Sequence, residues 1–330
     1  MIADFVKQER PSRGGTEAGG DEADFDKPRV KKSVSSKVRR ELQRIARQVT
    51  QGRLRVPMQG SGQAELMLAD RSAAGLGAAL RPSPAPDLTT FMDYEYEVDL
   101  TGTQAAAHVI RMVGANKKVL EIGAGSGAIT KHLVRTNGCA VTALEINPKS
   151  RAKLQSYTDD IYALDLNDPS WASEAAASGP FDCVVAADVL EHLYDPWAVL
   201  DGMASLLAPD GSIVLSLPHA GHSAILACLM QEDFEYREWG LLDKTHIRFF
   251  GINNIEALYE RAGLGIVEAQ FVVKIPEETE FAERWRALPR EVRAALSANA
   301  FGSVYQVVTK AKPRNDTDRF IKLSEMAVRD

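Results

Sequence analysis

The stretch Val119-Leu120-Glu121-Ile122-Gly123-Ala124-Gly125-Ser126-Gly127 decides the fold of this chain. Residues 118–122 are mostly apolar and predict a buried strand, and the three glycines that follow predict a tight turn that leaves room for a ligand. Residues 128–136 then have a helical pattern. A strand, a glycine-rich turn and a helix in this order are typical of the ligand-binding corner of a doubly wound α/β fold.

Strands and helices continue to alternate beyond this corner, which predicts a parallel sheet with helices on both faces. Further strands are expected at residues 140–145, 161–164, 181–187 and 212–217, with two later ones at about 266–273 and 303–310. Helices are expected at residues 103–113, from residue 148, at 196–207, and within 277–299.

The chain divides into three expected parts: a flexible N-terminal extension (1–89), an α/β domain (90–312) and a polar C-terminal tail (313–330). The stretch from Lys27 to Arg55 has eleven Lys or Arg and one Glu, although the whole chain carries −6. An amphipathic basic helix is expected near residues 33–51. It could pack on the main domain or a second copy in a homodimer, or bind an acidic partner, anionic lipid or nucleic acid. The acidic region around the glycine turn argues against nucleic acid.

The composition is that of a globular protein, with 45% hydrophobic and 25% charged residues in 330. There is no run of apolar residues long enough to cross a membrane, and the acidic N-terminus does not resemble a transit peptide. The three cysteines form no CxxC pair, which argues against a disulfide framework. A soluble cytoplasmic protein is therefore expected.

Acidic residues gather at the carboxyl ends of the expected strands. Glu121 precedes the glycine turn, and Glu145, Asp165 and Asp188 end or follow the next three strands. Such a rim suits a cationic ligand with an ammonium and a sulfonium group, and suits a pyrophosphate poorly. S-adenosyl-L-methionine fits this description, with Glu145 placed to accept from ribose hydroxyls and Asp165 from an adenine amino group. The glycine pattern also permits the dinucleotide fingerprint of an NAD-dependent oxidoreductase, but no second nucleotide-binding half is evident.

Three motifs together resemble those of class I S-adenosylmethionine-dependent methyltransferases: residues 119–127, Ala143-Leu144-Glu145 and Asp188-Val189-Leu190-Glu191-His192. The resemblance covers about residues 90–310 and implies a seven-stranded, mostly parallel sheet with a reversed final strand. It also implies which residues hold the cofactor. The methionine part falls to Glu121 and the turn with Gly123, Ala124, Gly125 and Gly127, the ribose to Glu145, and the adenine to Ile146, Asp165 and Leu166, while Asp188 adds a further carboxylate.

A second resemblance concerns the region after the fifth expected strand. Residues 216–222 and 240–250 resemble a bacterial methyltransferase subgroup associated with cell-surface glycan synthesis, although His219 stands where that subgroup usually has Asn. The resemblance implies a glycan or small-molecule acceptor.

Methyl transfer to a hydroxyl is an in-line displacement that benefits from a base near neutral pH. His246 is the expected base, with Asp243 orienting it or contacting substrate and His222 as a second candidate. The alternative is that residues 243–248 only shape the wall of the site. A metal site could be assembled from His192, His219, His222, Asp243 and His246, but no HExxH motif occurs and no metal is expected. A non-catalytic scaffold that binds the cofactor is the alternative outside the enzyme class.

Overall fold

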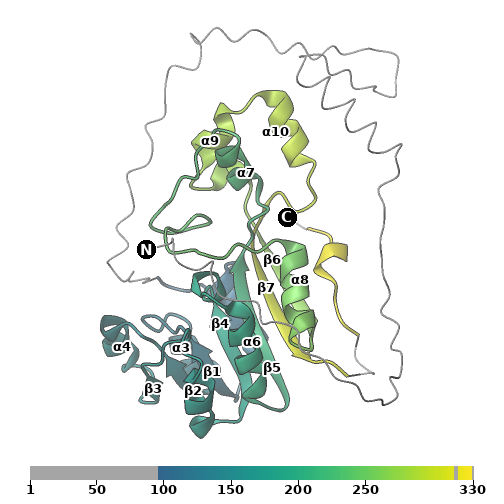
Figure 1. Ribbon diagram of the computed structural model, residues 1–330. Helices are drawn as coiled ribbons and strands as arrows, with labels where there is room; N and C mark the ends of the chain where they lie inside the picture. The colour runs from purple at the N-terminus through teal and green to yellow at the C-terminus, as the bar shows by residue number, and fades with distance from the viewer. Residues whose placement is uncertain (1–95, 316–318, 329–330) are drawn as a thin grey trace, which may run out of the picture. The chain divides into compact units, whose positions relative to one another are not determined.

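A computed structural model describes residues 96–315 and 319–328, which lie in a compact unit assigned to Arg81–Asp330 (Figure 1). The extension at residues 1–89 and its basic helix near 33–51 lie outside the described residues. Within the part that is described, no helix is long and apolar enough to cross a membrane.

The centre of the unit is a seven-stranded sheet with strand order β3-β2-β1-β4-β5-β7-β6. Strands β1 to β5 run parallel, and β7 is antiparallel to both of its neighbours. The predicted α/β fold with a reversed final strand is confirmed. The strands are β1 (Lys118–Ile122), β2 (Ala140–Leu144), β3 (Ile161–Tyr162), β4 (Phe181–Ala187), β5 (Leu207–Pro218), β6 (Leu264–Val273) and β7 (Val304–Pro313).

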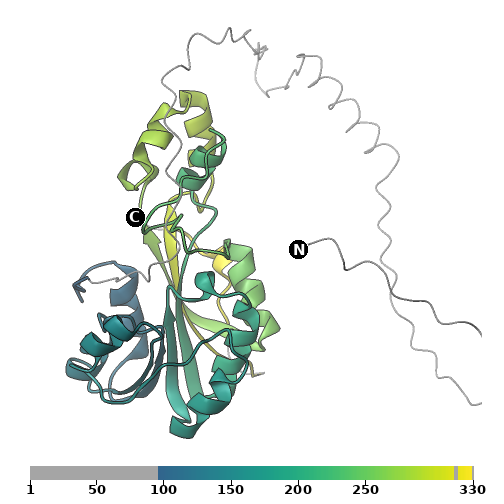
Figure 2. The same cartoon turned by 60° about the vertical axis from the view of Figure 1, so that its left-hand side comes forward.

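Helices cover both faces of the sheet (Figure 2). On one face α2 contacts β4, β5 and β7, and α3 contacts β2; on the other, α6 contacts β5 and α8 contacts β6. Strand residues alternate between these faces, so Val119 and Leu120 enter separate buried cores. The main helices are α2 (Ala105–Val113), α3 (Thr130–Arg135), α4 (Pro148–Leu154), α5 (Trp171–Ala175), α6 (Pro196–Ser205), α7 (Ser223–Leu229), α8 (Ile252–Arg261), α9 (Ala282–Ala287) and α10 (Arg290–Ser297).

Several regions differ in detail from the sequence-based expectations. Strand β5 begins at Leu207 rather than near residue 212, because the turn at Asp210, with φ of 64°, is a bulge inside the strand. The helical stretch 277–299 is broken into α9 and α10 at Pro289, which cannot continue a helix from the residue before it. Helices α5, α7 and α8 were not predicted from the sequence.

The C-terminal residues also contribute to the packing. Leu323, in a short 3-10 helix at Leu323–Glu325, is fully buried, and the backbone N–H of Ile321 donates to the carbonyl of Ile266. Residues 319–328, which the sequence places in a polar tail, therefore pack against the α8 side of the sheet.

Candidate active site

A cavity of about 230 Å³ lies at the carboxyl ends of β1, β4 and β5. The glycine turn forms one wall, and segments after β4 and before α8 form the opposite wall. The residues that line it are Tyr96, Gly123, Ala124, Gly125, Ser126, Ala128, Ala187, Asp188, Glu191, His192, Pro218, Trp239, Gly240, Asp243, His246, Tyr305 and Gln306.

The glycine turn has the backbone conformation that the sequence predicts. Gly125 and Gly127 have φ of 55° and 91°, a region that side chains with a Cβ rarely adopt. A Cβ on Gly125 would meet no atom within 4 Å, so the backbone faces open space there. A Cβ on Gly127 would lie 2.7 Å from the Tyr157 ring. One glycine thus keeps a surface clear, and the other allows close packing behind the turn.

Glu145 holds the turn in place. One carboxylate oxygen accepts from the backbone N–H of Gly125 at 2.7 Å, and the other accepts from the N–H of Asn147 at 2.7 Å. Asn147 in turn caps the N-terminus of α4, where its side chain accepts from the N–H of Lys149. Glu145, the carboxylate predicted to contact the ribose, therefore contacts the backbone of the glycine turn that is predicted to bind the cofactor.

Glu121 lies behind the turn, at the buried end of β1. Its carboxylate accepts a hydrogen bond from the Thr130 hydroxyl at 2.6 Å. Burial raises the pKa of Glu121 to about 7, and the nearby negative charge of Glu145 adds to this effect. A cation bound next to it would favour the ionised form.

The remaining acids differ in their contacts and in their place at the sheet edge. Asp188, with φ of 53°, lines the cavity, and its two oxygens accept from the Ser216 hydroxyl and the Gln306 amide, both at 2.8 Å. Burial raises the pKa of Asp188. Asp165 is exposed and accepts from the backbone and side-chain N–H groups of Asn167, and Ile146 is 46% exposed just after β2.

Leu166, the other residue expected beside the adenine, is half-buried and packs against the larger hydrophobic core. Ile146, Asp165 and Leu166 follow the neighbouring strands β2 and β3 and lie outside the lining of the cavity. The cofactor residues predicted from the sequence thus divide between the cavity wall and the adjacent sheet edge.

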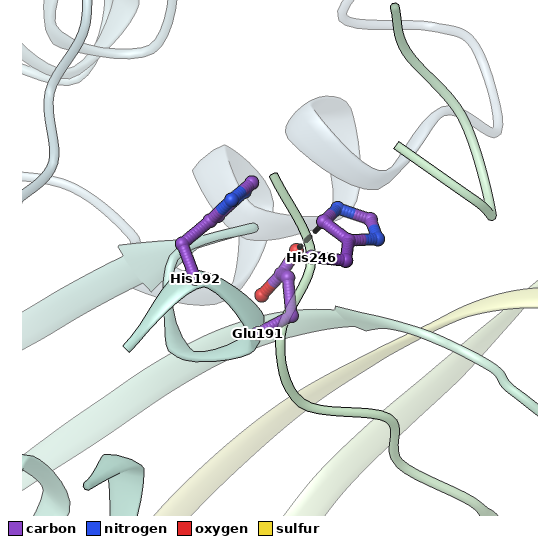
Figure 3. Close-up of side chains that lie close together, drawn as sticks. All are labelled: Glu191, His192 and His246. Carbon is purple, nitrogen blue, oxygen red and sulfur yellow. Dashed lines mark ion pairs between the residues drawn. The ribbon is translucent and has the colours of Figure 1, made fainter. Parts of the chain in front are cut away.

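A short 3-10 helix at Leu190–His192 forms the opposite wall together with a loop that lies far away in the sequence. The N–H groups of Ile247 and Arg248 both donate to the carbonyl of Glu191 at 2.9 Å. These two bonds bring His246 beside Glu191. Figure 3 shows the two side chains pointing toward one another, with Glu191 Oε1 3.8 Å from His246 Nε2.

His246 and His192 are neighbours in this wall, with ring centroids 4.8 Å apart. Nδ1 of His246 donates to the carbonyl of Leu241 at 3.3 Å, and Nδ1 of His192 donates to the carbonyl of Thr245 at 3.3 Å. A carbonyl only accepts, so both rings carry the proton on Nδ1 and a lone pair on Nε2. Burial lowers the pKa of both histidines, that of His246 to about 4.

Asp243 is connected to His192 through the hydroxyl of Thr245. Its Oδ1 accepts from the Thr245 hydroxyl at 2.6 Å, and the same hydroxyl oxygen lies 2.9 Å from His192 Nδ1. The chain Asp243–Thr245–His192 is therefore continuous. The sequence predicted that Asp243 orients His246 or contacts substrate; the observed hydrogen bonds link it to the neighbouring histidine.

His222 and His219 have structural contacts. Nδ1 of His222 accepts from the N–H of Ala224 and caps α7, while Nε2 donates to the carbonyl of Lys274 at 2.8 Å. Nδ1 of His219 donates to the carbonyl of Val304 at 3.1 Å. Both ring nitrogens of His222 are thus occupied by backbone groups, which leaves no lone pair for a substrate proton.

Glu191 is the residue of this wall that the sequence-based site omitted, although it stands in the Asp188–His192 motif. The motif alone does not reveal that this carboxylate is fully buried next to His246. Tyr96, Tyr305 and Gln306 also line the cavity without having been predicted. Tyr96 lies far in the sequence from the adjacent residues Tyr305 and Gln306 of β7, so no local pattern could have identified them.

The geometry fits S-adenosyl-L-methionine. The open backbone at Gly125 provides a surface for the ligand, and a buried carboxylate with a pKa of about 7 lies behind it at Glu121. Asp188 adds an acidic oxygen pair to the cavity wall itself. These groups favour a positively charged ligand over a pyrophosphate.

Comparison with known proteins identifies the family of this chain. Residues 96–269, more than half of the chain, match the profile of the methyltransferase domain family. The ubiquinone biosynthesis O-methyltransferase of Psychrobacter cryohalolentis is 31% identical over 137 residues, which are 40% of this chain and 52% of that protein. Its counterpart in Xanthomonas axonopodis pv. citri is 35% identical over 109 residues, 32% of this chain and 45% of that protein. The chain thus spans about half the length of these curated relatives.

Solved structures with a similar fold include two N-methyltransferases. The NodS N-methyltransferase of Bradyrhizobium japonicum, in complex with S-adenosyl-L-homocysteine, has a TM-score of 0.40 and 19% identity over 64% of this chain and 84% of its own. The 1,6-didemethyltoxoflavin-N1-methyltransferase of Burkholderia thailandensis has a TM-score of 0.40 and 18% identity over 64% of this chain and 77% of its own. On the evidence of the domain match, the chain belongs to the methyltransferase domain family.

Proposed function

We propose that this protein transfers the methyl group of S-adenosyl-L-methionine to a hydroxyl oxygen of a small molecule or glycan. The observation that carries the proposal is that the glycine turn and the His192–His246 wall open onto one cavity. A methyl donor on the turn and an acceptor at the histidines would then face each other. The names of the curated relatives, which are O-methyltransferases, support oxygen as the acceptor atom.

The reaction needs little from the protein beyond position and removal of one proton. An acceptor oxygen attacks the methyl carbon in line with the sulfur, the new C–O bond forms, and the C–S bond electrons return to sulfur. The hydroxyl proton passes to Nε2 of His246, the base predicted from the sequence, with His192 as the second imidazole at the same wall. His222 is not retained as a base because backbone groups hold both of its nitrogens.

The cofactor-binding residues predicted from the sequence form part of the proposal. Glu121 and the turn of Gly123, Ala124, Gly125 and Gly127 hold the methionine part, with Asp188 across the cavity. Glu145 and Ile146 serve the ribose and adenine after β2, and Asp165 with Leu166 serves the adenine after β3. We also propose a cytoplasmic location, since all three cysteines are buried and free.

The experiment is to measure formation of S-adenosyl-L-homocysteine with a panel of hydroxylated acceptors, glycans and phenols included. For an acceptor that turns over, we expect His246→Ala to lower kcat by about 10²–10⁴-fold, as for loss of a general base. The affinity for the cofactor, measured by calorimetry, should remain unchanged. The role of His246 is wrong if the variant keeps wild-type kcat, and the hydroxyl acceptor is wrong if only amine acceptors turn over.

A further inference from the structure

Glu191 is a buried carboxylate without a hydrogen-bond donor. The residue is fully buried, and within the described residues neither of its oxygens accepts a hydrogen bond. The nearby carboxylate of Asp188 is different, because each of its oxygens has a donor, Ser216 and Gln306. Burying a carboxylate without such partners is costly, unless a cation or a proton compensates for it.

Two histidines present ring nitrogens to this carboxylate. One ligand atom from each of Glu191, His192 and His246 lies within 4.8 Å of the other two. Figure 3 shows that the two histidines come from different segments and that the ion pair joins Glu191 to His246. Both Nδ1 atoms donate to backbone carbonyls, those of Leu241 and Thr245. This is the outer hydrogen bond that fixes ring orientation and leaves Nε2 free in metal-binding histidines.

We propose that Glu191, His192 and His246 bind a divalent transition-metal cation. Two imidazole nitrogens and one carboxylate oxygen are a donor set that suits zinc, manganese or iron better than calcium or magnesium. The cation would compensate the charge of Glu191, which no described donor contacts. All three residues line the cavity, so further coordination positions would face the acceptor. The expectation of no metal rested on the absence of an HExxH motif, and this proposal departs from it.

The site rests on the proposed function in one respect, because it puts the cation where the acceptor oxygen would arrive. The cation and the substrate proton would use the same imidazole nitrogens, so proton transfer to His246 describes the protein without the cation. A cation held by Glu191, His192 and His246 would lower the pKa of an acceptor hydroxyl beside it, and the hydroxyl proton would then pass to water. The C–O and C–S bond changes are the same in both cases.

The test uses the full chain, treated with a chelator and desalted. Binding of Zn²⁺ is measured by calorimetry, and binding of Co²⁺ by its visible absorption, which reports the ligand geometry. We expect one cation per chain in the wild type and an affinity at least about tenfold weaker in Glu191→Gln and in His246→Gln. Matched control variants are Glu268→Gln and His108→Gln, whose residues lie outside the cavity lining and should leave cation affinity unchanged.

Two results would overturn the proposal: wild-type protein that binds neither cation saturably, or Glu191→Gln and His246→Gln variants that bind as tightly as the controls. Circular dichroism shows whether Glu191→Gln or His246→Gln fails to fold. If one of them does, the cation affinity of the other variant decides whether the proposal stands. Binding of S-adenosyl-L-homocysteine to the cation-free wild type separates the two proposals. If the cation-free protein binds S-adenosyl-L-homocysteine but no cation, only the metal site is wrong. If it does not bind S-adenosyl-L-homocysteine, the proposed function is wrong.

Discussion

Burial raises the pKa of acidic side chains in this protein and lowers the pKa of histidines. It raises the pKa of Glu121 to about 7, because the ionised carboxylate loses water, and it lowers the pKa of His222 to about 4, because the protonated imidazole does. Both groups are therefore neutral over part of the pH range in which exposed counterparts are charged. This makes their protonation sensitive to what binds or packs beside them.

At Glu121 we predict a pH-dependent affinity for the cofactor. A bound cation favours the ionised carboxylate, so affinity for S-adenosyl-L-methionine should rise as pH increases toward and through about 7, and then level off. Glu121→Gln should weaken binding by about tenfold or more and flatten this dependence. Calorimetry between pH 6 and 8.5, with Glu268→Gln as the control, measures both effects. An unchanged pH slope in Glu121→Gln would contradict the assignment.

At His222 we predict an effect on stability. Because its folded pKa lies below the unfolded value, the unfolded chain binds a proton first, and stability should fall as pH drops from about 6.5 toward 4. His222→Asn can still cap α7 but does not titrate, so it should lose less stability over that range. Urea unfolding at pH 7 and pH 5 compares the two proteins. Equal losses would show that His222 does not contribute to the pH dependence.

At the level of elements, the glycine turn must pack closely against Tyr157 at Gly127 and leave a surface open for the ligand at Gly125. Gly127→Ala places a Cβ against the Tyr157 ring at a positive φ and should destabilise the protein by about 1–3 kcal/mol. Gly125→Ala meets no neighbouring atom, so its cost should be smaller and come from backbone strain alone. Its methyl group would instead occupy the ligand surface and weaken cofactor binding. Thermal unfolding and calorimetry of both variants test this contrast, which fails if Gly125→Ala binds the cofactor normally.

The sequence predicted the elements around this turn well, for a physical reason. Strands β1 and β4 are buried on both faces, and their apolar runs at 118–122 and 181–187 mark the observed bounds. Prediction was poorer where long-range contacts decide. Residues 207–211 join β5 only by pairing with β4, as Leu207 does with Phe181.

Long-range contacts also limited how much of the candidate site could be predicted from the sequence. The glycine turn and the acids that follow β1 to β4 could be located because the carboxyl ends of parallel strands share one edge. The histidines after β5 could not be separated by sequence, since their roles depend on distant backbone groups. Lys274 holds His222, whereas the carbonyl of Glu191 positions the loop with His246.

At the level of the whole unit, helices α7, α9 and α10 form a group beyond the end of the sheet (Figure 1). Arg284 of α9 is buried and pairs with Asp233 and with Glu235, the latter at 2.6 Å. These acids belong to the segment between α7 and Gly240, which forms part of the cavity wall. The arginine thus links the helical group to the wall.

Removal of this charge should therefore destabilise the protein. Arg284→Met removes the partner of Asp233 and leaves Glu235 paired with Arg237 alone, and we predict a loss of about 3 kcal/mol in the free energy of unfolding. Arg290→Met, at an exposed position at the start of α10, is the matched control and should change stability by less than about 0.5 kcal/mol. Chemical denaturation measures both, and similar losses in the two variants would contradict the role given to Arg284.

The central claim concerns the ligand that the glycine turn accepts, and competitive calorimetry tests it most directly. The full chain is titrated with S-adenosyl-L-methionine, S-adenosyl-L-homocysteine and NAD under one set of conditions, with Gly125→Ala as the blocked control. The account predicts that both sulfur nucleosides bind at one site per chain, that NAD does not, and that the control binds them more weakly. Binding of NAD in the absence of sulfur nucleoside binding would contradict it.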